Sequence, residues 1–68
     1  MDKVGSAVRA RREMLGISQA EAAGRSDGMV SEATWNVLEN GRQSSFKRRT
    51  LLGVARALRW PPDAITRI

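Results

Sequence analysis

Glycine and proline residues divide this chain into blocks that each have the length of a short helix. Four of the six glycines, at positions 16, 24, 28 and 41, separate these blocks, and Pro61 and Pro62 follow near the end. Within the blocks, apolar residues recur at intervals of three and four, as in Leu51, Val54 and Leu58, and the alternation typical of β-strands is nearly absent. The sequence therefore predicts an all-α fold, a compact bundle of about five short helices.

Three serines are placed to begin helices. Ser18 and Glu21 have the spacing of a capping box, in which the hydroxyl accepts from a helix amide and the carboxylate reaches back. Ser31 and Ser45 are the expected caps of two later helices. The predicted helices cover residues 4–15, a stretch after Ser18, 32–40, about 46–58, and a short fifth from about 60.

The stretch between the second and third helices contains few core residues. Residues 24–28 read Gly-Arg-Ser-Asp-Gly, a composition typical of turns. We therefore expect the second helix to fray here and to continue as a slack turn.

The size and the missing residue types exclude most enzyme classes. A chain of 68 residues has room for one core, so we expect a single domain over residues 1–68. It has no cysteine, histidine or tyrosine, and thus lacks disulfides and the commonest metal ligands and general bases. We expect no enzyme activity, no catalytic residue, no metal, no cofactor, no small-molecule substrate, and a cytoplasmic protein.

The charge balance indicates a polyanionic partner. Twelve Lys and Arg against seven Asp and Glu give a net charge of +5. No uncharged stretch approaches the roughly 20 residues that cross a bilayer, and the charges do not gather on one helical face, so no membrane is expected. RNA is a weaker partner than duplex DNA, because the only aromatic residues are Trp35, Phe46 and Trp60.

The second and third helices suit a helix-turn-helix, predicted at about residues 18–40, that lays its second helix in the major groove. At 100° per residue, an inward Trp35 belongs to the core and leaves one face of the third helix outward. Candidate base-reading residues on that face are Glu32, Ala33, Asn36 and Val37. A glutamate accepts from cytosine N4, an asparagine pairs with adenine, and small apolar side chains meet the thymine methyl.

Basic and amide side chains near helix ends are candidates for phosphate contacts. The set comprises Gln19, Asn40, Arg42, Lys47, Arg48 and Arg49. Gln19 stands at the start of the second helix, where free amides also bind anions. Cations at the start of the fourth helix oppose its dipole unless an anion lies there, and a DNA phosphate supplies that anion.

Two charges lie beside apolar stripes and are expected to pair. Arg12 follows Val8 by four residues and precedes Leu15 by three, and Glu39 follows Trp35 by four. An isolated charge at either position would be costly, so an Arg12–Glu39 ion pair is the economical arrangement. The alternative is two exposed, unpaired charges.

Three motifs in order resemble the Cro and phage-repressor (Xre-type) helix-turn-helix family, with its lambda-repressor-like fold, over residues 4 to about 66. They are Arg12 with Leu-Gly-Ile-Ser-Gln-Ala-Glu-Ala-Ala at 15–23, Ser-x-x-Thr-Trp-x-x-Leu-Glu-Asn-Gly-Arg at 31–42, and Thr-Leu-x-x-Val-Ala-x-Ala-Leu at 50–58. The segments at 46–51 and 60–63 look like versions from actinobacteria and their phages.

The resemblance implies a transcriptional regulator, a phage-type repressor or Cro-like protein of phage immunity, located at the nucleoid when bound to DNA. It places base reading on Glu32, Ala33 and Val37, with Asn36 beside them, and it implies the Arg12–Glu39 bridge. It also implies double-stranded DNA as partner. A homodimer on a palindromic operator and a monomer are both compatible with the sequence.

The chain departs from that family at three places. Ala22 stands where leucine is usual, which thins the core under the second helix. Between Ala23 and Thr34 there are about two residues more than in the compact family turn. The loop between Gly41 and Thr50 is also longer and carries four basic residues and no acid, so we expect it to contact DNA.

A second interpretation is a protein-interaction module of the same fold, an antitoxin or the partner of another regulator. Trp60, Ile65 and Ile68 could form an apolar patch or a homodimer seam. The alternative is that they close the core through the fifth helix.

Overall fold

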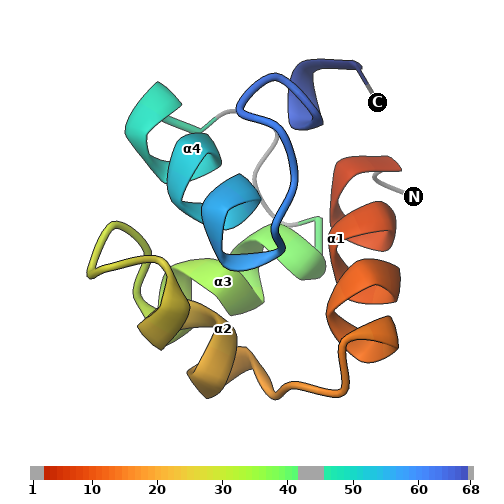
Figure 1. Cartoon of the computed structure of the whole chain (residues 1–68), viewed down its shortest axis with the longest axis vertical. Coiled ribbons are helices and arrows are strands. Elements are labelled where there is room, and N and C mark those ends of the chain that lie inside the picture. The colour runs from red at the N-terminus through yellow and green to blue at the C-terminus, as the bar shows by residue number, and fades with distance from the viewer. Residues whose placement is uncertain (1–2, 42–45, 68) are drawn as a thin grey trace.

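A computed structural model of the chain describes residues 3–41 and 46–67, apart from the side chain of Thr66. The described part is all-α, as predicted, and measures 23 × 21 × 20 Å (Figure 1). Its elements are α1 (Lys3–Met14), α2 (Gln19–Arg25), α3 (Glu32–Glu39), α4 (Arg48–Ala57) and a 3-10 turn at Ile65–Arg67. Figure 1 shows α3 at the centre, with α1 along one side and α2 and α4 on the others.

The first two expected caps are present. The backbone amide of Glu21 donates to Ser18 Oγ at 3.1 Å, and the amide of Ser18 donates to Glu21 Oε1 at 3.4 Å, which completes the capping box of α2. Ser31 Oγ accepts from the amide of Thr34 at 3.1 Å and so caps α3. The helix starts that position α2 and α3 are therefore encoded locally.

The predicted cap of the fourth helix is wrong. The helix begins at Arg48, and its N-cap is Lys47, whose extended backbone accepts the first helical hydrogen bond from Leu51 at 3.2 Å. Ser45 lies outside the described residues, and it is two positions too early to cap this helix. A lysine side chain carries no acceptor, so α4 begins without a side-chain cap.

The prediction of a fifth α-helix is also wrong, because a shorter 3-10 turn stands in its place among the described residues. After α4 the chain turns at Arg59, whose φ is +58°, and the amide of Ala64 then donates to the carbonyl of Pro61 at 3.0 Å. Two adjacent prolines remove two backbone donors, and Pro62 disfavours helical backbone at the residue before it. Only the 3-10 turn at Ile65–Arg67 follows.

The turn between α2 and α3 is held in place and is not slack. Ser26 is fully buried; its hydroxyl donates to the carbonyl of Ala23 at 2.6 Å and accepts from the amide of Val30 at 3.0 Å. Asp27, in the left-handed region at φ +56°, pairs with Arg56 of α4 at 2.7 Å. A serine hydroxyl that bonds local backbone thus substitutes for core residues in fixing the turn.

The core lies between all four helices. Its largest fully buried side chains are Trp35, Leu38, Leu58, Val8 and Val54. Ala22 is also fully buried beneath α2. Trp35 is a core residue, as predicted.

The residues that close the core from the C-terminal side include two from the expected apolar patch. Ile65 is 5% exposed and belongs to the core, and Trp60 is partly buried against it. Ile68 lies outside the described residues. The core-closure interpretation therefore accounts for Ile65, whereas Trp60 is only partly buried and lines a hollow with Met29 and Leu52.

Candidate nucleic-acid interface

One face of α3 is open to solvent, and it is the face that the helical spacing predicts. Trp35, Leu38 and Glu39 are buried, whereas the candidate base-reading residues lie on the other side. Glu32, Ala33 and Asn36 are exposed and Val37 is half-buried. Together with Gln19 of α2, these four line a shallow hollow of about 500 Å³.

The start of α4 adjoins this face. Ala33, Thr34 and Val37 of α3 share a second hollow of about 410 Å³ with Phe46, Lys47 and Thr50. The two hollows have Ala33 and Val37 in common, so the surface is continuous from the start of α2, across α3, to the start of α4.

Lys47 lies at that end of the surface, and two further candidate phosphate-binding cations, Arg48 and Arg49, follow it in the first turn of α4. Lys47, Arg48 and Arg49 are exposed and form no ion pair within the described part of the chain. No acidic residue stands in the first turn of α4. Arg42, the fourth basic residue of the predicted set, lies outside the described residues.

The three amide side chains of the candidate surface form a chain of hydrogen bonds, which the sequence did not predict. Asn40 Nδ2 donates to Asn36 Oδ1 at 2.9 Å, and Asn36 Nδ2 donates to Gln19 Oε1 at 3.1 Å. Gln19 Nε2 in turn donates to Glu39 Oε1 at 3.2 Å. An ionised carboxylate only accepts, so Glu39 fixes the direction of every amide in the chain.

Asn36 keeps free hydrogen-bonding capacity in this arrangement. One of its two amide hydrogens bonds Gln19, and one of its two carbonyl lone pairs bonds Asn40. One donor and one acceptor remain, which is the pair that adenine requires in the major groove. The amide chain is thus compatible with base reading by Asn36.

Glu39 is the centre of a buried network that joins α1, α2 and α3. The predicted partner Arg12 donates from Nε to Oε2 at 2.7 Å and from Nη2 to Oε1 at 3.1 Å. The Trp35 indole N–H donates to Oε2. Arg12 also donates to the carbonyl of Ile17 at 2.8 Å, which ties the loop between α1 and α2 to the same pair.

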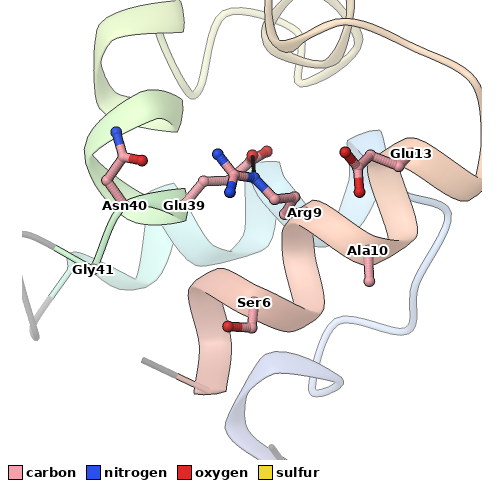
Figure 2. A pocket seen from close by; sticks show the side chains of 7 residues that line it. All are labelled: Ser6, Arg9, Ala10, Glu13, Glu39, Asn40 and Gly41. Carbon is pink, nitrogen blue, oxygen red and sulfur yellow. Dashed lines mark hydrogen bonds and ion pairs between the residues drawn. The ribbon is translucent and has the colours of Figure 1, made fainter. Parts of the chain in front are cut away.

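Arg9 approaches the same carboxylate from the solvent side. Its Nε lies 3.4 Å from Glu39 Oε1, and its side chain is 51% exposed, compared with 14% for Arg12. Figure 2 shows Arg9 reaching from α1 toward Glu39, at a pocket of about 500 Å³ between α1 and the end of α3. The pocket is lined by Ser6, Arg9, Ala10, Glu13, Glu39, Asn40 and Gly41.

The environment of Glu39 lowers the pKa of its carboxyl. Burial alone raises this pKa, but hydrogen bonds from Arg12, Trp35 and Gln19, together with the Arg12 charge, outweigh burial. The hydrogen bond to Glu39 correspondingly raises the pKa of the Arg12 guanidinium. Both groups are therefore charged at neutral pH, and the carboxylate acts as a fixed acceptor.

Sequence reasoning identified the ion pair but missed three further donors to Glu39, from Arg9, Gln19 and Trp35. A signal for one of them was available. Trp35 and Glu39 are four residues apart on one helix, and a buried indole N–H requires an acceptor. The contact of Gln19 depends on how α2 packs against α3, which spacing along the chain does not give.

Other kinds of site find no support in the described residues. No group of three or more His, Cys, Asp or Glu side chains among them could hold a metal ion. None of the described helices combines the length and apolar character that a membrane span requires.

Comparison with known proteins gives one positive result. The chain matches the family described as "Helix-turn-helix domain" over residues 3–68. Neither a curated protein nor a solved structure matches it. A helix-turn-helix domain suggests DNA binding and is typically non-catalytic. With the match extending over nearly the whole sequence, this chain belongs to the helix-turn-helix domain family.

Proposed function

We propose that the chain binds double-stranded DNA with sequence specificity and acts as a transcriptional regulator, a repressor or Cro-like protein of the Xre type. The observation that carries this proposal is the continuous surface that runs from the exposed face of α3 to the start of α4, where three exposed cations have no ion pair among the described residues. A helix face with polar and small apolar side chains suits the major groove, and adjacent cations suit the DNA backbone.

Base reading is assigned to four residues of α3. Glu32 accepts from cytosine N4, and Asn36 pairs with adenine through the donor and acceptor that the amide chain leaves free. Ala33 and Val37 lie between the two hollows, where a thymine methyl makes an apolar contact. All four are within reach of one groove because they share one face of a helix.

Phosphate binding is assigned to the residues at the edges of this face. Lys47, Arg48 and Arg49 supply positive charge at the start of α4, and Arg42 precedes them in the chain. Gln19 and Asn40 supply amide donors from the start of α2 and the end of α3. A phosphate at the uncapped start of α4 accepts from free backbone amides and offsets the clustered cations.

A protein-interaction role receives less support. It depends mainly on an apolar patch at the C-terminal end, and Ile65 of that patch is buried in the core. Two copies on a palindromic operator remain part of the proposal, since a dimer doubles the number of bases read.

Selection of bound sequences from a random duplex pool tests the proposal. We expect a consensus to emerge, with an affinity for it that falls steeply as salt rises, because each phosphate contact releases counterions. A palindromic consensus supports two bound copies. Failure to enrich any sequence, or an affinity that stays flat between low and moderate salt, contradicts sequence-specific DNA binding.

A further inference from the structure

The end of α3 packs against α1 at a glycine. Gly5 is buried in α1, and a Cβ atom built on it would lie 2.6 Å from the Leu38 carbonyl oxygen and 2.8 Å from that of Glu39. These are backbone atoms of α3, so no side-chain rotation can relieve the overlap. Any larger residue at position 5 must move α1 and the end of α3 apart.

The turn before α3 packs against α4 at a second glycine. Gly53 is buried in α4, and a Cβ atom there would lie 2.6 Å from Met29 Cβ and 2.9 Å from Val30 Cγ2. Met29 Cβ is attached directly to the backbone and cannot swing aside. The turn therefore lies closer to α4 than any other residue at position 53 would permit.

Any displacement of this turn would also move the start of α3. Val30 is followed at once by Ser31, the N-cap of α3, and Val30 is itself bonded to Ser26 in the turn. An exposed Asp27–Arg56 ion pair also connects the other end of this turn to α4. The turn and the start of α3 are thus one unit whose distance from α4 is set at Gly53.

We propose that Gly5 and Gly53 are positioning residues that fix the two ends of α3 and thereby set the angle at which it meets DNA. This inference rests on the proposed function. It assigns part of the sequence preference to two positions in the interior, outside the surface formed by α3 and the start of α4.

Gly53→Ala is the principal test, and Gly24→Ala is its matched control. Gly24 is also a helical glycine, in α2, but a Cβ atom there meets nothing within 4 Å. Both changes add one methyl group and favour helix. Only Gly53→Ala is expected to change the pose of α3.

Two readouts separate positioning from loss of stability. The first is the orientation of α3 relative to α1 in the DNA-free protein, from residual dipolar couplings of backbone amides. The second is the consensus selected from a random duplex pool. For Gly53→Ala we expect α3 to be reoriented and the ratio of specific to nonspecific affinity to fall about tenfold, comparable with one mismatched base pair.

A compensating change provides the rescue. Met29→Gly removes the closest obstructing atom and leaves only the Val30 methyl at 2.9 Å, so the double variant Met29→Gly/Gly53→Ala is expected to move the orientation of α3 and the consensus back toward those of the unchanged protein. If Gly53→Ala does not fold, the double variant carries the test, and its refolding with the original consensus supports the proposal. If both variants remain unfolded, Gly5→Ala is measured by the same two readouts and decides the question at the other end of α3.

The same measurements distinguish a failure of the glycine positioning role from a failure of DNA binding. If the unchanged protein selects no consensus, DNA specificity is contradicted, while the dipolar couplings still decide whether the glycines set the pose of α3. If Gly53→Ala folds and keeps both the orientation and the consensus, as Gly24→Ala does, the positioning role is overturned. Lower stability with an unchanged consensus overturns it equally.

Discussion

The buried network around Glu39, which forms the junction of α1, α2 and α3, and the basic start of α4 use charged side chains in opposite ways. At the junction, Glu39 has a fully buried side chain and is bonded by Arg12 at 2.7 Å. At the start of α4, Lys47, Arg48 and Arg49 are exposed and have no ion pair among the described residues. Charge in this chain therefore stabilises the fold where it is both buried and paired, and it is available to a partner where it is exposed and unpaired.

The largest expected effect is on the junction. Arg12→Ala leaves the buried carboxylate without its main partner, and we expect the free energy of unfolding to fall by about 3 kcal/mol. Because the two groups are coupled, the double variant Arg12→Ala/Glu39→Ala should cost less than the sum of the single changes. Urea denaturation of the four proteins measures both quantities, and additive losses would show that the pair is not coupled.

Arg9→Ala is the matched control for this prediction. Arg9 contacts the same carboxylate, but at 3.4 Å and with a side chain that is about half exposed. Exposed ion pairs contribute about 0–1 kcal/mol, so this variant should unfold nearly as the unchanged protein does. A loss equal to that of Arg12→Ala would mean that burial does not distinguish the two arginines.

On the proposed DNA-binding surface, the candidate base-reading residues should govern which base pairs are preferred. We expect Asn36→Ala to remove about 1–3 kcal/mol of discrimination at one or two base pairs, with nonspecific affinity almost unchanged. Glu32→Ala should act similarly at another position. Glu13→Ala removes an exposed carboxylate from α1 and serves as the control, with no change in consensus expected.

The cations of α4 should show the opposite pattern. Replacing Lys47, Arg48 or Arg49 by alanine should weaken binding to all sequences alike and lower the slope of log affinity against log salt by up to about one unit each. Arg67→Ala is the matched control, because Arg67 is paired with Asp63 at the C-terminal end. A changed consensus in Arg49→Ala would instead indicate that the start of α4 reads bases.

Acid pH should weaken the junction selectively. The folded state lowers the pKa of Glu39, so its contribution to stability is fully present above the unfolded pKa, about 4.3. This contribution is lost as the pH falls through the lower pKa of the folded state. Unfolding free energies measured from pH 7 to pH 2.5 should therefore decline more steeply in the unchanged protein than in Glu39→Gln, and parallel curves would argue against a lowered pKa.

The features that sequence predicted well depend on local chemistry. Ser18 and Ser31 cap their helices because serine hydroxyls serve amides only two or three residues away. The first and third helices were predicted at residues 4–15 and 32–40 and are found at Lys3–Met14 and Glu32–Glu39. Helical periodicity also placed the buried and exposed faces of α3 correctly.

The features that sequence missed depend on contacts between distant segments. Ser26 is buried because α4 covers the turn, and no local rule distinguishes it from an exposed turn serine. The close approaches at Gly5 and Gly53 likewise join residues more than 20 positions apart, so spacing along the chain carries no sign of them. The prediction of a Ser45 cap was wrong because it relied on the preference for serine at helix starts. In the structure the helix begins after Lys47, whose extended backbone starts the helix without a side-chain cap.

An NMR titration of the protein with its selected duplex tests whether DNA binds the exposed face of α3 and the start of α4. We expect the largest changes in amide shifts at Gln19, at Asn36 and its neighbours on the exposed face of α3, and at the start of α4. The buried Trp35 indole, held by Glu39, should shift little. Changes concentrated instead at the separate hollow around Met29 and Trp60, with α3 unaffected, would contradict the assignment of the exposed α3 face to DNA.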